Sequence, residues 1–134
     1  MFKERKTHNK YSKKLKQSNY TLKYGCFGIK VSSFGRLTKE QCDSLKWLIS
    51  KKLKYLTNNK KSFRFWMPLS LNFTLTKFSL ESRMGKGKGS IYTHAAYVRP
   101  GFILLEFDNI TEQQMKKLFF YLVKKISFKI VLIK

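Results

Sequence analysis

The chain has few acidic residues. Only 7 Asp and Glu stand against 29 Lys and Arg in 134 residues, so the formal net charge is +22 at pH 7. A compact body with that charge repels itself in water, which indicates a polyanionic partner. Hydrophobic residues still make up 43% and aromatic residues 16% of the chain. We therefore expect a real core and, at this length, a single folded domain.

Long apolar runs and paired cysteines are also missing. The longest apolar runs, Phe102 to Leu105 and Ile130 to Ile133, fall far short of the roughly 20 residues that cross a bilayer, which excludes a transmembrane protein. Cys26 and Cys42 have neither C-x-x-C spacing nor a neighbouring histidine. We predict two small buried thiols, with no metal site and no cofactor.

The few carboxylates are scattered, which argues against an enzyme. Glu106 and Asp108 form the nearest pair, and they would share a sheet face only if a strand continued past Phe107. No sequence spacing groups His8 or His94 with a cysteine as a nucleophile and its base. We predict no catalytic residues, and His94 is expected to be a structural histidine within a strand.

The N-terminal stretch is polar and strongly basic. Residues 1–23 contain eight Lys and Arg against Glu4, and Leu15 and Leu22 are their only aliphatic residues. Such a segment cannot fold by burying itself, so we expect it to become ordered on a partner. A mitochondrial transit peptide is an alternative, but the stretch is Lys-rich and lacks an amphipathic face. We divide the chain into a basic extension, 1–23, and one α+β domain, 24–134.

Two segments carry helix-start signals. Leu37–Gln41 and Ile110–Gln114 each contain a capping box, in which a threonine caps the helix and a glutamine three residues later reaches back. Apolar residues then recur every 3.6 positions, as far as the stop at Thr57–Asn59 in the first helix and as far as Ile126 in the second.

Aromatic and β-branched runs predict strands before, between and after these helices. The predicted strands are Tyr24–Val31, Phe63–Met67, Thr93–Val98, Phe102–Phe107 and Phe128–Ile133. The turn Arg99-Pro100-Gly101 is expected to join the third and fourth strands as a hairpin. A turn is expected at Ser32 to Gly35. The fold class that follows is α+β in two layers, with both helices on one face of a mainly antiparallel sheet.

The most specific motif is Arg83-Met84-Gly85-Lys86-Gly87-Lys88-Gly89. Alternating glycines let a backbone approach another surface closely, and lysines supply charge for phosphate oxygens, so the motif is suited to a phosphate contact. A solvated loop is the plain alternative. The motif is no Walker A loop, because Lys88 is followed by Gly89 and no helix pattern begins at Ser90. It also lacks the Gly-x-Gly-x-x-Gly spacing of dinucleotide-binding folds.

With this motif the chain resembles the universal L-sixteen family of large-subunit ribosomal proteins and looks like an organellar member. The resemblance covers about Lys3 to Ile133. Besides Arg83–Gly89, it rests on Phe27-Gly28-Ile29-Lys30, Gly35-Arg36-Leu37-Thr38 with Gln41, Arg99-Pro100-Gly101 with Glu106, and Arg5-Lys6 with His8.

The resemblance implies a non-catalytic protein on large-subunit rRNA, near the tRNA sites and the peptidyl transferase region. Such a protein supports tRNA positioning and subunit maturation. Its partners would be rRNA, tRNA and neighbouring ribosomal proteins, with no membrane and no homo-oligomer. The RNA-binding residues expected are Lys3, Arg5, Lys6, His8, Lys10, Lys13, Lys14, Arg36, Arg64, Arg83, Met84, Gly85, Lys86, Gly87, Lys88 and Gly89. A free-standing basic RNA-binding protein or RNA chaperone is the alternative.

Some positions depart from the family pattern. Asn9-Lys10 replaces a glycine, Ser127 replaces a proline, and Leu69 to Phe73 is apolar where the family has a polar turn. We hypothesise that this apolar stretch contacts a protein neighbour. Among the aromatics, Phe63, Phe65, Phe102 and Phe107 are expected in the core, and Tyr11 and Tyr20 are the candidates for base stacking.

The location is inferred from where the resemblance begins. It starts almost at the first methionine, which leaves no room for a cleaved import signal and favours an organelle-encoded protein. The number of departures favours the mitochondrion, with the plastid as second choice.

Overall fold

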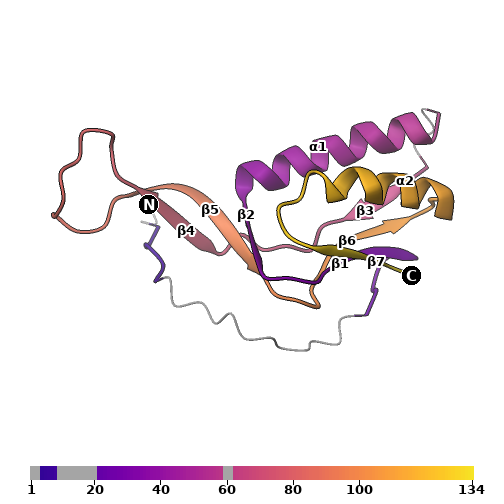
Figure 1. The fold of residues 1–134 in the computed structure, drawn as a ribbon, viewed down its shortest axis with the longest axis horizontal. Helices are drawn as coiled ribbons and strands as arrows, with labels where there is room; N and C mark the ends of the chain where they lie inside the picture. The colour runs from indigo at the N-terminus through magenta and orange to yellow at the C-terminus, as the bar shows by residue number, and fades with distance from the viewer. Residues whose placement is uncertain (1–3, 9–20, 59–61) are drawn as a thin grey trace.

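The computed structural model describes residues 4–8, 21–58 and 62–134. Figure 1 shows two helices on one side of a sheet, and a pair of long strands that runs away from them and ends in a loop. The strands are β1 (Phe27–Val31), β2 (Gly35–Thr38), β3 (Arg64–Trp66), β4 (Phe73–Lys77), β5 (Ser90–Val98), β6 (Ile103–Asp108) and β7 (Ile130–Ile133); the helices are α1 (Lys39–Leu56) and α2 (Glu112–Val123). The α+β class is confirmed.

The strands form two sheets, where one was expected. The first has the order β3-β6-β1-β7 and the second has the order β2-β5-β4, and all pairs are antiparallel. The helices lie over the first sheet (Figure 1). The second sheet extends beyond the helices and carries the glycine loop, which the segment 78–89 forms between β4 and β5.

The predicted hairpin between residues 93–98 and 102–107 is wrong. Both strands exist, but β5 lies in the second sheet and β6 in the first. The turn between them is bonded to the end of β1: the Gly101 N–H donates to the Val31 carbonyl at 2.7 Å, and the Val31 N–H donates to the Phe102 carbonyl at 2.8 Å. Because both strands already have neighbours on each side, neither offers a free edge to the other.

Two strands were not predicted from the sequence. Residues 35–38 lie where a turn and a helix cap were expected, yet they pair with β5 before α1 begins. The second missed strand, β4, begins at Phe73, whose ring packs edge-on against Tyr97 at a centroid distance of 5.0 Å. Leu69 and Leu71 pack against the core. These contacts partly bury the apolar stretch within the chain, and its contact with a protein neighbour stays a hypothesis.

Both helix starts are confirmed. The Gln41 N–H donates to Thr38 Oγ1 at 3.4 Å, and the Thr38 N–H donates to Gln41 Oε1 at 3.0 Å. Thr111 and Gln114 make the same reciprocal pair at 3.3 and 3.2 Å. Each box satisfies two N–H groups that a helix start otherwise leaves without partners.

The core lies between the helices and the four-stranded sheet. Its fully buried side chains are Ile29, Ile49, Leu53, Leu104, Leu105, Phe107, Met115, Leu118 and Leu122, with Val31 and Val98. Phe63, Phe65 and Phe102 pack against this cluster, so the expected core aromatics are confirmed. No helix among the residues that the structure describes is long and apolar enough to span a membrane.

The two cysteines differ, which corrects the expectation of two buried thiols. Cys42 is buried in α1, whereas Cys26 is exposed just before β1, with its sulfur 3.6 Å from Asp108 Oδ1. Side chains alternate between the faces of an extended segment, and the next residue, Phe27, points into the core. Cys26 is therefore directed outward.

Candidate nucleic-acid interface

The glycine loop projects from the far end of β4 and β5, away from the helices (Figure 1). Residues 78–88 are all exposed, and Leu80 and Met84 have essentially their whole side chains in solvent. The loop surrounds a hollow of about 670 Å³. The loop therefore contributes no buried side chain to the core and leaves its whole surface open to a partner.

The backbone of the loop explains its glycines. Gly85, Lys86 and Gly87 have φ values of 104°, 60° and 80°, in the left-handed region that favours glycine. A Cβ at Gly85 or Gly87 would meet nothing within 4 Å, so packing within the chain does not require either glycine. At Gly89 a Cβ would collide with the backbone of Lys77, so the base of the loop is tight while its tip is open.

The loop carries mostly positive charge. Arg83, Lys86 and Lys88 are exposed, as is Lys77 at the base, and Glu81 is the acidic residue of this segment. Cations beside an open, glycine-rich backbone suit phosphate oxygens, because the backbone permits a close approach and the side chains neutralise charge.

The start of the N-terminal arm lies against β4. The Thr7 N–H donates to Thr74 Oγ1 at 3.0 Å, and the Thr74 N–H donates to Thr7 Oγ1 at 3.1 Å. Glu4 adds a polar contact to the next strand, β5, with its Oε1 3.3 Å from His94 Nε2. Since β4 is an edge strand, its backbone groups were open to such pairing.

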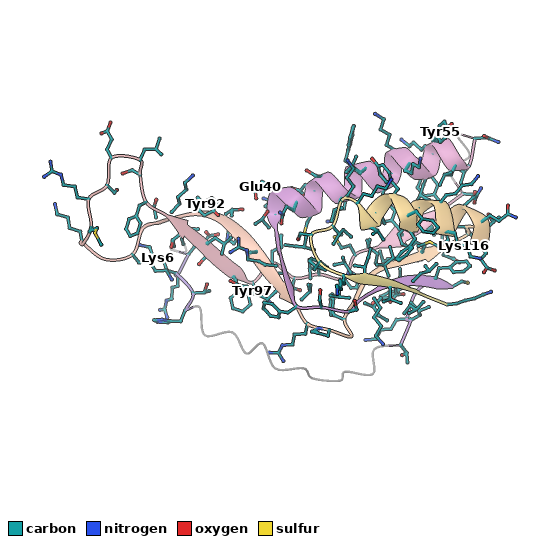
Figure 2. The ribbon with its side chains drawn as sticks, viewed as in Figure 1. Lys6, Glu40, Tyr55, Tyr92, Tyr97 and Lys116 are labelled. Carbon is teal, nitrogen blue, oxygen red and sulfur yellow. The ribbon has the colours of Figure 1, made fainter. Side chains whose placement is uncertain are left out.

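Two lysines join the arm to the glycine loop. Lys6 Nζ donates to the Lys88 carbonyl at 2.9 Å, and Lys88 Nζ donates to the Thr7 carbonyl at 2.6 Å. Each ammonium is thus bound to a carbonyl oxygen of the other segment. We call this set of contacts, from Thr7, Thr74, Lys6 and Lys88, the arm–loop clasp. Figure 2 shows Lys6 at the base of the loop.

The clasp concerns residues 4–8 of the arm, and the expectation that the extension 1–23 becomes ordered on a partner stays a prediction. At residues 4–8 the docking uses polar bonds to an edge strand, a route that an argument from apolar content overlooks. The clasp threonines were also missed as functional positions. The period-two alternation of Phe73-Thr74-Leu75-Thr76-Lys77 was the signal that could have revealed the strand.

A second anchor holds the chain where the arm meets the domain. Glu106 is 2% exposed, and its carboxylate accepts N–H groups from Lys23, Tyr24 and Gly25 at 2.6 to 3.3 Å. Several backbone donors around one carboxylate stabilise its charge and fix the path of the chain. Glu106 is therefore structural.

The structure brings some of the predicted RNA-binding residues together and separates others. Lys6 is bonded to Lys88 of the glycine loop, and the Arg5 carbonyl accepts from Thr74 Oγ1 of β4 at 3.4 Å; His8 follows these residues in the chain. Arg36 is exposed on β2, and Arg64 is exposed on β3 at the edge of the other sheet. Neither belongs to the surface formed by the loop and arm. Lys3, Lys10, Lys13 and Lys14 lie outside the described residues, as do Tyr11 and Tyr20.

The described part of the chain contains no arrangement that suits catalysis by a metal. No group of three or more His, Cys, Asp or Glu there could hold a metal ion. Burial raises the pKa of the Cys42 thiol, which opposes the thiolate form that a nucleophile needs. A hydrogen bond from Thr93 lowers the pKa of Glu40, so this carboxyl stays ionised and is unsuited to act as a general acid.

Comparison with known proteins agrees with this geometry. A model of the family described as ribosomal protein L16p/L10e matches residues 1–133. The chain is 45% identical over 127 residues to a protein of Chondrus crispus named large ribosomal subunit protein uL16m, covering 95% of this chain and 92% of the relative.

Bacterial proteins named large ribosomal subunit protein uL16 are also similar. The protein of Buchnera aphidicola subsp. Cinara cedri is 30% identical over 132 residues, covering 98% of this chain and 92% of the relative. The protein of Aeromonas hydrophila is 29% identical over 123 residues, covering 92% and 85%.

Together with these similarities, the cationic α+β fold and its projecting glycine–lysine loop define a ribosomal protein. Such a protein is a structural component and not an enzyme. The chain belongs to the ribosomal protein L16p/L10e family. The family expected from the sequence is thereby confirmed, and the similarity to uL16m agrees with the expected organellar member.

Proposed function

We propose that this chain is a structural constituent of the mitochondrial large ribosomal subunit and that its glycine loop and arm together hold rRNA. The 45% identity to uL16m supports the compartment and the particle. The observation that carries the RNA proposal is the arm–loop clasp, which holds the start of the basic arm against the basic glycine loop.

Within this surface the cations have different tasks. Lys88 is bonded to the arm, so it positions the two segments. Arg83 and Lys86 are exposed at the open tip and supply charge for phosphates. Gly85 and Gly87 present a backbone that a folded RNA can approach closely.

We extend the proposal to the rest of the arm and to tRNA. Residues 1–23 act as an RNA-binding extension of the domain 24–134, and the loop tip faces the tRNA sites. The shape of the molecule supports this arrangement, because the loop and residues 4–8 lie together at the end opposite the helices (Figure 1). Neighbouring ribosomal proteins complete the surroundings.

Co-sedimentation with large subunits tests the proposal. We expect the full chain to remain with the particle through moderate salt, because its phosphate contacts are numerous. A chain that stays at the top of the gradient would instead be a free RNA-binding protein or chaperone, and the proposal would be wrong.

Paired variants locate the contact. Arg83→Ala with Lys86→Ala should reduce the slope of log affinity for rRNA against log salt by about 1.4 to 1.8, since each neutralised phosphate contributes roughly 0.7 to 0.9. Lys54→Ala with Lys117→Ala, at exposed helix positions away from the loop, removes the same charge and serves as the control. An unchanged slope in the double variant would contradict the role of the loop.

A further inference from the structure

A second feature lies on the opposite end of the molecule from the glycine loop. A groove of about 340 Å³ runs between α1 and α2 and is lined by Trp47, Leu48, Lys51, Lys52, Tyr55 and Tyr121. We call these residues the aromatic–lysine groove. Figure 2 shows Tyr55 near the end of α1 that is far from Lys6 and the arm–loop clasp. The groove is therefore a separate surface from the loop.

The aromatic rings of the groove are not part of the core. The core face of α1 is formed by Cys42, Leu45, Ile49 and Leu53. On another face, Trp47 is 61% exposed and Tyr55 is 76% exposed. Large rings left in solvent on a well-packed helix contribute little to the fold, so a partner that covers them explains their presence better.

The lysines of the groove lie over the ring faces. Lys51 Nζ is 4.9 Å from the Trp47 ring centroid. Lys52 Nζ is 5.4 Å from the centroid of Tyr55 and 5.3 Å from that of Tyr121, so it bridges the two helices. None of the lining residues is acidic. The groove therefore offers flat apolar faces and ammonium groups side by side.

We propose that the aromatic–lysine groove binds unpaired nucleotides of RNA. Aromatic faces stack splayed bases, and neighbouring ammonium groups neutralise the connecting phosphates. When a base stacks on the ring face, the lysine can move from the ring to a phosphate. An ammonium–phosphate contact then replaces the cation–π contact. This inference rests on the proposed function in one respect: the RNA that the groove binds in the cell is rRNA.

An acidic protein segment fits the groove less well. Its carboxylates would pair with Lys51 and Lys52 but would leave the faces of Trp47 and Tyr55 without a stacking partner. Duplex RNA also fits poorly, because its bases are stacked within the helix and only phosphates and groove edges are available. Single-stranded RNA uses both chemical features of the groove.

Trp47 fluorescence provides a local test in the full chain. The variant Trp66→Phe leaves Trp47 as the single tryptophan, since the chain has two. We expect single-stranded octaadenylate to quench this fluorescence, and a GC-rich RNA hairpin to quench it much less at equal phosphate concentration. Absence of quenching by octaadenylate would overturn the proposal.

Variants in the Trp66→Phe background measure the stacking. Tyr55→Leu removes an exposed ring and should weaken octaadenylate binding about tenfold, the equivalent of 1.4 kcal/mol for one stacked base. Lys51→Ala with Lys52→Ala should weaken it at least as much. Lys54→Ala with Lys117→Ala removes the same charge from exposed helix positions outside the groove and should have a much smaller effect.

Three further outcomes would overturn the assignment. One is an equal loss of affinity in the Lys54 and Lys117 control. A second is unaltered binding by Tyr55→Leu, with thermal unfolding confirming that this variant is folded. A third is quenching by decaglutamate as strong as that by octaadenylate, which would assign the groove to an acidic protein segment.

The loop variant separates this inference from the proposed function. Arg83→Ala with Lys86→Ala should leave Trp47 quenching intact, because the groove is remote from the loop (Figure 2). Normal quenching by a chain that does not sediment with large subunits would overturn the proposed function alone. Sedimentation without quenching would overturn the groove alone.

Discussion

The helical end and the loop end of the molecule are built on different principles. At the helical end, two capped helices and a four-stranded sheet enclose an apolar core. At the loop end, two strands extend into a segment that is exposed throughout residues 78–88 and is tied to the arm by polar bonds.

The difference shows how a chain with a net charge of +22 can fold. Apolar burial at the helical end provides the free energy of folding, while the loop end contributes no core and leaves its cations exposed to a polyanion. Stability and RNA affinity should therefore respond to mutations in different places.

The largest expected effect is a loss of stability at the helical end. Leu105→Ala removes a fully buried side chain from β6 and should lower the free energy of unfolding by about 2 to 5 kcal/mol. Met84→Ala, at a fully exposed loop position, should change it by less than about 0.5 kcal/mol. Urea unfolding measures both, and similar values would contradict the division between the two ends.

The next effect concerns the junction of arm and domain. Glu106→Gln removes the charge that accepts three backbone N–H groups and should lower the free energy of unfolding by about 1.5 to 3 kcal/mol. Asp108→Asn, on the same strand but less buried, is the control. Faster proteolysis near residues 21–25 should accompany the loss, and unchanged stability and proteolysis would refute the anchor.

A smaller effect is expected at a helix start. Thr111→Ala removes the side-chain acceptor for the Gln114 N–H and should lower the free energy of unfolding by about 1 kcal/mol. Thr111→Ser, which retains the hydroxyl, should recover most of it. A serine variant as unstable as the alanine variant would show that the methyl group matters more than the cap.

The smallest effect on stability should come from the arm–loop clasp. Thr74→Val deletes the hydroxyl that receives the Thr7 N–H and should cost less than about 1 kcal/mol. Trypsin should nevertheless cleave after Arg5 and Lys6 faster than in the unmodified chain. Thr76→Val, a neighbouring position on the same strand, is the control, and equal cleavage rates in both variants would argue against the clasp.

The sequence predicted the features that arise from short stretches of chain. Both capping boxes involve residues three apart, so their residue types alone predicted them. The core aromatics Phe63, Phe65, Phe102 and Phe107 followed from their strand neighbours. The glycine loop could be recognised because φ values such as those of Gly85 and Gly87 require glycine.

The candidate site was predicted in composition but not in geometry. The sequence supplied the basic residues, yet nothing in it paired Thr7 with Thr74, 67 positions away. Arg36 and Arg64 were predicted as RNA-binding residues too, and only the structure places them on edges of two different sheets. Periodicity along a helix revealed the core face of α1 but not that Tyr121 of α2 would complete a groove with Trp47 and Tyr55.

By itself the sequence determined the two helices, the apolar set that forms the core, the excess of positive charge and the glycine loop, because each depends on residue types at short separations. Only the tertiary structure determined that the strands form two sheets and that β5 and β6 belong to different ones. It also determined the arm–loop clasp and the aromatic–lysine groove. Strand pairing and side-chain contacts across long separations depend on which edges and faces remain open once the whole chain has packed.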